Sequence, residues 1–123
     1  MARPIPLILL LSLAACEAPL RPPSAAGVCW RAVDGLNGAP DFRPFASSVP
    51  NLESCAAQLE GLRMTHGRDM VGAYQGRIIY VTAADITAAS DSRSQRYRVF
   101  TPEQRAKIDA GYRDLAGRAG SAP

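Results

Sequence analysis

A chain of 123 residues has room for at most one folded domain. Only 7% of the residues are aromatic, so any core is small and needs additional stabilisation. The formal net charge of +3 is too low to indicate nucleic-acid binding by itself.

The amino-terminal residues follow the order of a secretory signal. Arg3 supplies a positive charge, a largely apolar run of nine residues extends from Leu7 to Ala15, and the run ends in small residues. A membrane-spanning helix needs roughly 20 apolar residues, so this run is too short to serve as a stable span. Residues 1–15 are therefore predicted to be a cleaved signal peptide.

The residues Leu13-Ala14-Ala15-Cys16 resemble the lipobox of bacterial lipoproteins, which has an aliphatic residue, two small residues and then cysteine. In that family the thiol is alkylated with diacylglycerol, the leader is cut before the cysteine, and the new amino group is often acylated. The resemblance covers residues 1–16 and implies that Cys16 is lipidated and becomes the first mature residue. Two or three acyl chains hold a protein firmly on a bilayer. An ordinary signal that ends near a cysteine is the alternative.

A tether is predicted at residues 16–27. The stretch Glu17–Gly27 contains three prolines and several small residues, a composition that favours neither a helix nor a central strand. The resemblance implies a location in the bacterial cell envelope, facing the periplasm, with the membrane bound through the acyl chains on Cys16. Glu17 occupies a position that influences inner-membrane retention in some bacteria, and the choice between the two membranes stays open.

Two cysteines, Cys29 and Cys55, remain in the mature chain. In an oxidising compartment they are expected to form a disulfide. It would close a loop of about 25 residues and contribute roughly 3–4 kcal/mol through loop-closure entropy. The competing hypotheses are weaker, because a zinc site normally needs four ligands and a redox pair has C-x-x-C spacing. No metal or other cofactor is predicted.

The folded part is predicted to begin with a strand. Side chains alternate along Gly27–Val33, as they do in a half-buried strand. Turn-forming residues crowd Asp34–Pro40 and end this strand. A loop is expected next, with Phe42 and Phe45 covering one side of the core.

A helix is expected after this loop, with Asn51 as its N-cap. The apolar residues of Leu52–Leu62 recur at helical spacing on one stripe, and Cys55 belongs to that stripe. Cys55 can therefore face a strand that carries Cys29, so the helix and the disulfide support one another.

A β-hairpin is expected over Met70–Thr82, where β-branched and aromatic residues flank Gln75-Gly76. One long strand bent at Gly76 is the alternative. The predicted fold class is therefore α+β. Residues 28–82 form a small antiparallel sheet with one packed helix, in β-α-β-β order and stapled by the disulfide, and a C-terminal helix is added.

The remaining chain divides into three parts. Residues 83–100 have few large apolar side chains and are predicted to be a polar, Arg-containing connector, although Ala83–Ala89 could form a short helix. A helix over residues 101–119 starts at a capping box with Thr101 as N-cap, and it packs on the sheet or docks on a partner. Residues 120–123 are expected to be a disordered tail.

The only histidine, His66, precedes Asp69 by three residues. A carboxylate can orient a histidine that acts as a general base. No nucleophile in a known motif accompanies this pair, so no catalytic residue is predicted. The alternative hypothesis is a small periplasmic hydrolase or ligand-binding protein that uses His66 and Asp69 with Arg68 or Arg77. It requires a concave pocket that gathers these side chains.

Three arginines, Arg93, Arg96 and Arg98, are interleaved with Tyr97 and Phe100. They form a candidate surface for an anionic partner such as lipid headgroups, an acidic protein or a cell-wall polymer. A solvated basic loop is the simpler alternative. Nucleic acid is not expected as a partner, because the predicted compartment does not contain it.

Together these features predict a non-enzymatic envelope lipoprotein. It would act as an accessory or protein-interaction module, held at a membrane face through Cys16, with an envelope protein as its expected partner.

Overall fold

In a computed structural model, the described part of the chain comprises residues 2, 4, 20–35 and 38–120. Cys16, on which the expected lipid anchor depends, lies outside these residues, as does most of the expected tail. The elements in chain order are β1 (Cys29–Asp34), β2 (Pro40–Ala46), α1 (Leu52–His66), β3 (Met70–Tyr74), β4 (Arg77–Val81), β5 (Ile86–Ala89), β6 (Tyr97–Arg98) and α2 (Pro102–Gly120).

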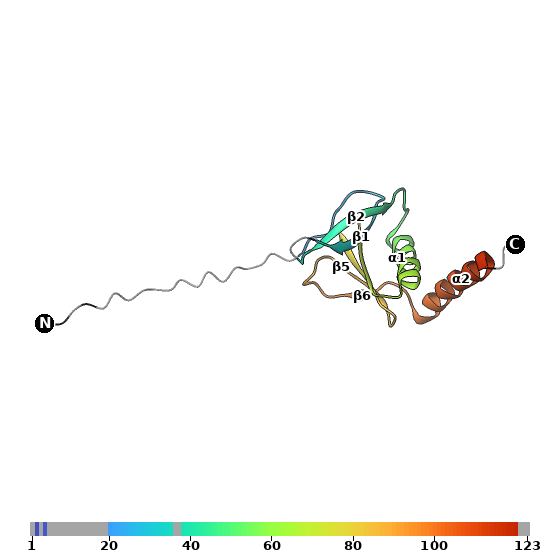
Figure 1. Ribbon diagram of the computed structural model, residues 1–123. Coiled ribbons are helices and arrows are strands. Elements are labelled where there is room, and N and C mark those ends of the chain that lie inside the picture. Colours follow the sequence, from blue (N-terminus) through green and yellow to red (C-terminus); the bar gives the residue numbers. More distant parts are fainter. Residues whose placement is uncertain (1, 3, 5–19, 36–37, 121–123) are drawn as a thin grey trace.

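The strands of the described chain form one six-stranded antiparallel sheet in the order β2-β1-β3-β4-β5-β6. α1 packs on the middle of this sheet, and α2 lies beside α1 and extends away from it (Figure 1). The predicted fold class is confirmed, with an antiparallel sheet, a packed helix, a disulfide and a C-terminal helix. The predicted β-α-β-β order lacks β2, β5 and β6.

The core lies between α1 and the central strands. Leu59 of α1 clusters with Ile79, Val81 and Ile86 of β4 and β5, and none of these side chains is more than 2% exposed. Burial of each such side chain contributes roughly 1.5–3 kcal/mol. The helix approaches β3 closely at Gly72, because a Cβ there would collide with the side chain of Leu59.

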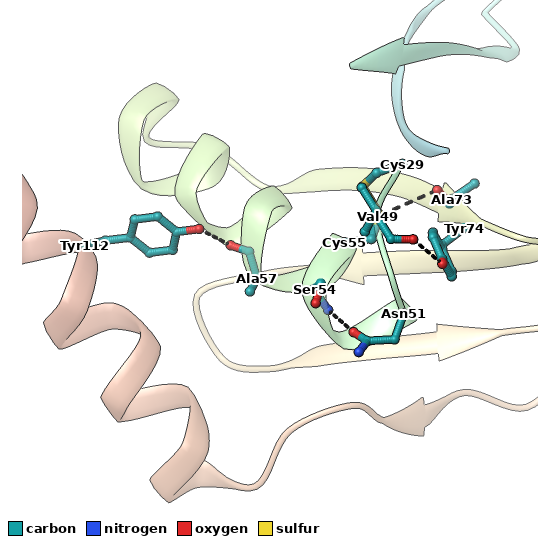
Figure 2. Close-up of a disulfide and its surroundings, with 9 residues drawn as sticks. All are labelled: Cys29, Val49, Asn51, Ser54, Cys55, Ala57, Ala73, Tyr74 and Tyr112. Atoms are coloured by element: carbon teal, nitrogen blue, oxygen red, sulfur yellow. Dashed lines mark hydrogen bonds between the residues drawn. A yellow bond between two sulfur atoms is a disulfide. The ribbon is translucent and has the colours of Figure 1, made fainter. Parts of the chain in front are cut away.

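The predicted disulfide between Cys29 and Cys55 is confirmed, and the two Cα atoms lie 5.4 Å apart. Both residues are fully buried, and the bond joins β1 to α1 (Figure 2). Beside it, the hydroxyl of Tyr74 donates a hydrogen bond to the carbonyl of Val49 over 2.6 Å. The disulfide is therefore part of the core.

Both ends of α1 are capped. The side-chain oxygen of Asn51 accepts a hydrogen bond from the N–H of Ser54 over 2.8 Å, which confirms the predicted N-cap. Gly67 adopts a left-handed conformation with φ 69°, and its N–H donates to the carbonyl of Arg63 over 2.8 Å. The chain can therefore turn back into β3 immediately after the helix.

β3 and β4 form the predicted hairpin. Tyr74 pairs with Arg77, and the turn between them is made by Gln75 and Gly76 with φ of 43° and 81°. The alternative, one long bent strand, is wrong.

The predicted loop through Phe42 and Phe45 is wrong, because this segment is strand β2. β2 lies at one edge of the sheet and pairs with β1 alone. Pro40 and Pro44 conceal the strand pattern in the sequence. An edge strand tolerates proline because only one of its sides is hydrogen-bonded to a neighbour.

The predicted connector at residues 83–100 contains two strands, β5 and β6, and the short helix considered at Ala83–Ala89 is wrong. Residues Ile86–Ala89 pair with β4 instead. The turn before β5 is held by Thr82, whose hydroxyl oxygen accepts a hydrogen bond from the N–H of Asp85 over 3.1 Å. Alanine has a low strand propensity, so this segment carries little strand signal in the sequence.

The predicted tether at residues 16–27 is too long, because the chain is bound to the folded body from Leu20 onward. The N–H of Leu20 donates to the hydroxyl of Ser92 over 2.7 Å. The carbonyl of Pro23 accepts a hydrogen bond from the N–H of Gly76 over 2.9 Å. The first four residues of the predicted tether lie outside the described residues.

α2 starts at the predicted capping box. Thr101 and Gln104 exchange side chain-to-backbone hydrogen bonds of 2.9 and 3.2 Å. The helix contacts α1, where the hydroxyl of Tyr112 donates to the carbonyl of Ala57 over 2.6 Å (Figure 2). Leu115, one turn further on, is 61% exposed. The end of α2 therefore stands away from the body.

Candidate functional site

A cleft of about 750 Å³ opens where β1 and β3 separate, and we name it the β1–β3 cleft. The pairing of the two strands ends at Arg31 and Gly72, although β1 continues to Asp34 and β3 begins at Met70. Its volume is in the range of sites that bind small molecules. The separation of the two strands thus creates a concave feature of the size of a ligand-binding site.

The interior of the β1–β3 cleft is mostly apolar. Ile78 and Tyr80 of β4 reach it from the sheet face opposite α1, because the alternating residues Ile79 and Val81 pack in the core beneath the helix. Its other apolar lining residues include Leu20, Ala32, Val33, Met70 and Val71. An apolar part of a ligand would be shielded from water there.

Three arginines, Arg31, Arg68 and Arg96, line the cleft. Within the described chain, the side chains of Arg31 and Arg68 make no ion pair or hydrogen bond. The guanidinium of Arg96 lies over the ring of Tyr80, 3.5 Å from its centre. Such a stack contributes about 0.5–1 kcal/mol at an exposed site and leaves the guanidinium N–H groups available. The cleft therefore offers guanidinium donors at both faces of the sheet, because Arg31 pairs with Gly72 on the α1 face and Arg96 stacks on Tyr80 on the other face.

The cleft also contains the side chains of the alternative hypothesis. His66 ends α1, and Arg68 and Asp69 follow in the exposed loop before β3; all three line the cleft. In the described chain, neither His66 nor Asp69 makes a side-chain hydrogen bond, so the structure does not bring them together as a base and its orienting carboxylate. Arg77 lies elsewhere, where it donates to the hydroxyl of Tyr97 over 2.6 Å.

The three arginines of the candidate anionic-partner surface do not all line the β1–β3 cleft. Arg96 alone lines it, while Arg98 lies on edge strand β6. The backbone N–H of Arg93 donates to Asp91 over 2.9 Å. Hydrogen bonds from Ser94 and from this N–H lower the pKa of the Asp91 carboxyl. Arg93 thus lies in a turn held by Asp91 and is not among the residues that line the cleft.

A second charged cluster, the Glu60 cluster, joins the two helices and the turn before β5. Glu60 of α1 is fully buried and pairs with Arg63 and with Arg105 of α2. Arg105 also donates to the carbonyl of Thr82 over 2.5 Å and lies 3.6 Å from Asp109. Burial raises the pKa of the Glu60 carboxyl, and the hydrogen bond from Arg63 opposes this rise. The cluster fixes α2 to the body.

Sequence reasoning misses the contribution of Arg31, Tyr80 and Leu20 to the cleft. Nothing in the local pattern shows that β1 and β3 separate after a short stretch of pairing. Glu60 is different, because it follows Ala56 by four residues and so falls on the apolar stripe of α1. That spacing could have indicated a buried carboxylate.

Two absences concern residues 2, 4, 20–35 and 38–120 only. No helix among them combines the length and apolarity needed to cross a membrane. Nor do they contain a group of three or more His, Cys, Asp or Glu side chains placed to hold a metal ion.

Comparisons of the chain with protein-family models, with curated proteins and with solved structures give no match in any of the three cases.

Proposed function

We propose that the chain is the precursor of an exported bacterial lipoprotein, held at a membrane face of the cell envelope through acyl chains on Cys16. The observation that carries this proposal is the lipobox-like Leu13-Ala14-Ala15-Cys16, followed by a body with a buried disulfide. Disulfides form and persist in oxidising compartments, which agrees with export.

The folded body acts as a non-enzymatic accessory or interaction module. The described charged side chains support this role, because the β1–β3 cleft offers guanidinium donors and an apolar interior, which suit binding. α2 adds a helix whose end stands away from the body, with Leu115 exposed. An envelope protein is the expected partner.

Lipid attachment is tested by intact-mass spectrometry and by fractionation of cells that produce the wild type or Cys16→Ser. We expect a mass increase equal to diacylglycerol, with or without an added acyl chain, and membrane attachment that the variant loses. Ala25→Ser, at an exposed position after the anchor, is the matched control and should stay attached. An unmodified thiol, or equal attachment of Cys16→Ser, would refute the anchor.

The interaction role is tested by purification from envelope solubilised in mild detergent. One partner should co-purify in stoichiometric amount with the wild type. Absence of any stable partner after mild crosslinking would argue strongly against a protein-interaction module.

A second candidate function, ligand binding or hydrolysis with His66 and Asp69, is favoured by one observation. The β1–β3 cleft gathers His66, Arg68 and Asp69, as that hypothesis requires. The enzymatic version predicts that His66→Ala abolishes the cellular function while the level of protein stays constant. An unchanged phenotype would refute the enzymatic version and leave only ligand binding as the second candidate function.

A further inference from the structure

We infer that the β1–β3 cleft binds the phosphate headgroup of an anionic lipid in the same bilayer that anchors the chain. This inference rests on the proposed lipidation of Cys16. It deepens that proposal by naming a ligand class for a site on the body.

The first argument is the short distance between the anchor and the cleft. Leu20 lines the cleft and is fixed to Ser92 by two hydrogen bonds, of 2.7 and 3.2 Å. Only three residues lie between Cys16 and Leu20, and the four steps from one to the other span at most about 14 Å when fully extended. A lipid on Cys16 therefore holds this side of the body against the membrane surface.

The second argument is charge. Arg31 is half-buried, and its guanidinium has no ion-pair or hydrogen-bond partner within the described chain. The exposed Arg68 also lacks an ion-pair or hydrogen-bond partner within the described chain. Arg96 stacks on Tyr80, and its N–H groups can still donate hydrogen bonds. Planar guanidinium groups match the geometry of phosphate oxygens and form paired, charge-assisted hydrogen bonds with them.

The third argument is the mixture of surfaces inside the cleft. Ile78, Val71 and Ala32 offer apolar contact to a glycerol backbone and the first methylenes of acyl chains. The carboxylates of Asp34 and Asp69 also line the cleft, and they can accept hydrogen bonds from headgroup hydroxyls. A phosphate ester of a polyol, such as phosphatidylglycerol, uses all three kinds of lining.

The test compares thermal unfolding of the mature, lipidated protein in two kinds of nanodisc. One contains phosphatidylcholine alone, and the other contains phosphatidylcholine with phosphatidylglycerol. Because a ligand that binds only the folded state stabilises it, we expect Tm to rise by about 4–8 °C in the anionic discs. Arg31→Gln and Arg68→Gln should each abolish most of this rise. Arg68 is exposed, so its variant remains informative even where Arg31→Gln fails to fold.

The matched control is Arg113→Gln, which removes one positive charge from an exposed position on α2 and should keep the full rise. Equal loss in Arg113→Gln would show a general charge effect and overturn the assignment. So would the absence of any rise in the wild type. Free glycerol phosphate, added to discs of phosphatidylcholine, should have little effect. An equal rise with that soluble anion would overturn the lipid as the source.

Failure of this inference is separable from failure of the anchor. Intact mass of the same preparation reports lipid on Cys16 independently of Tm. A lipidated protein without a response to phosphatidylglycerol overturns the headgroup site and leaves the proposed function standing.

Discussion

Two regions of the molecule use charged side chains in different ways. In the buried Glu60 cluster, Glu60 holds Arg63 and Arg105. In the β1–β3 cleft, Arg31 and Arg68 lack ion-pair and hydrogen-bond partners in the described chain. The first arrangement joins elements of the fold, whereas the second leaves donors available for a ligand.

This difference separates stability from binding. Removing a side chain from the Glu60 cluster should lower the free energy of unfolding, because its buried partners lose an ion pair or a hydrogen bond. Removing an unpaired arginine from the cleft should change that free energy little and act on ligand binding instead. Each experiment below tests one side of this division.

The largest effect is expected for the disulfide. Replacing Cys29 and Cys55 together by Ala should lower the free energy of unfolding by about 3–4 kcal/mol, because the unfolded chain regains the freedom of a closed loop. Urea denaturation followed by circular dichroism measures this loss. Reduction of the wild type should give a loss of similar size, and a double variant as stable as the oxidised wild type would show that the bond does not staple the fold.

A smaller loss is expected for Glu60→Ala, about 2–3 kcal/mol. The change empties a fully buried position and takes the shared acceptor from Arg63 and Arg105. Glu53→Ala is the matched control, because Glu53 lies exposed in the first turn of the same helix and should cost less than about 1 kcal/mol. Equal losses of free energy in the same urea assay would mean that the Glu60 cluster stabilises the fold no more than an exposed carboxylate does.

A comparison of the wild type with Glu60→Gln at several pH values extends this test. The difference in the free energy of unfolding should not exceed the loss in Glu60→Ala. Burial raises the pKa of Glu60 in the folded state, and the hydrogen bond from Arg63 opposes the rise. A carboxyl with a raised pKa contributes its stability below the unfolded pKa and loses it as the pH rises through the folded pKa. The advantage of the wild type over Glu60→Gln should therefore be greatest in acid and shrink as the pH rises. An advantage that grows with pH would indicate that the ion pairs lower this pKa.

Much of the architecture can be predicted from local patterns in this sequence. The helix capped by Asn51, the hairpin turning at Gly76 and the pairing of Cys29 with Cys55 all follow from signals within short segments. β2 and β5 escape prediction for opposite reasons. Prolines interrupt the pattern in β2, and alanines weaken it in β5, while contacts with neighbouring strands decide both.

The candidate site is less predictable than the fold. His66 and Asp69 attract attention because of their chemistry, and the structure does place them at the cleft. Arg31 and Leu20 join them only because β1 separates from β3 and the amino-terminal segment binds beside Ser92. Both features depend on contacts between segments that are far apart in the sequence, so no local residue spacing predicts them.

Tyr112→Phe should lower the free energy of unfolding by about 1 kcal/mol, because it weakens the contact between α1 and α2. This change removes the hydroxyl that donates to the carbonyl of Ala57 over 2.6 Å. Leu115→Ala, on the exposed part of the same helix, should change the free energy of unfolding by less than about 0.5 kcal/mol. If both variants behave alike, the contact at Tyr112 does not hold the helix.

The smallest effect is expected for Arg68→Gln, measured in detergent without anionic lipid. Arg68 is exposed and its side chain has no polar partner in the described chain, so the free energy of unfolding should stay within about 0.5 kcal/mol of the wild type. Arg105→Gln makes the same chemical change in the Glu60 cluster. It should cost about 2 kcal/mol, because Glu60 and the carbonyl of Thr82 lose a charged donor. A loss above 1 kcal/mol in Arg68→Gln would mean that the cleft arginines also support the fold, and the division between the two regions would fail.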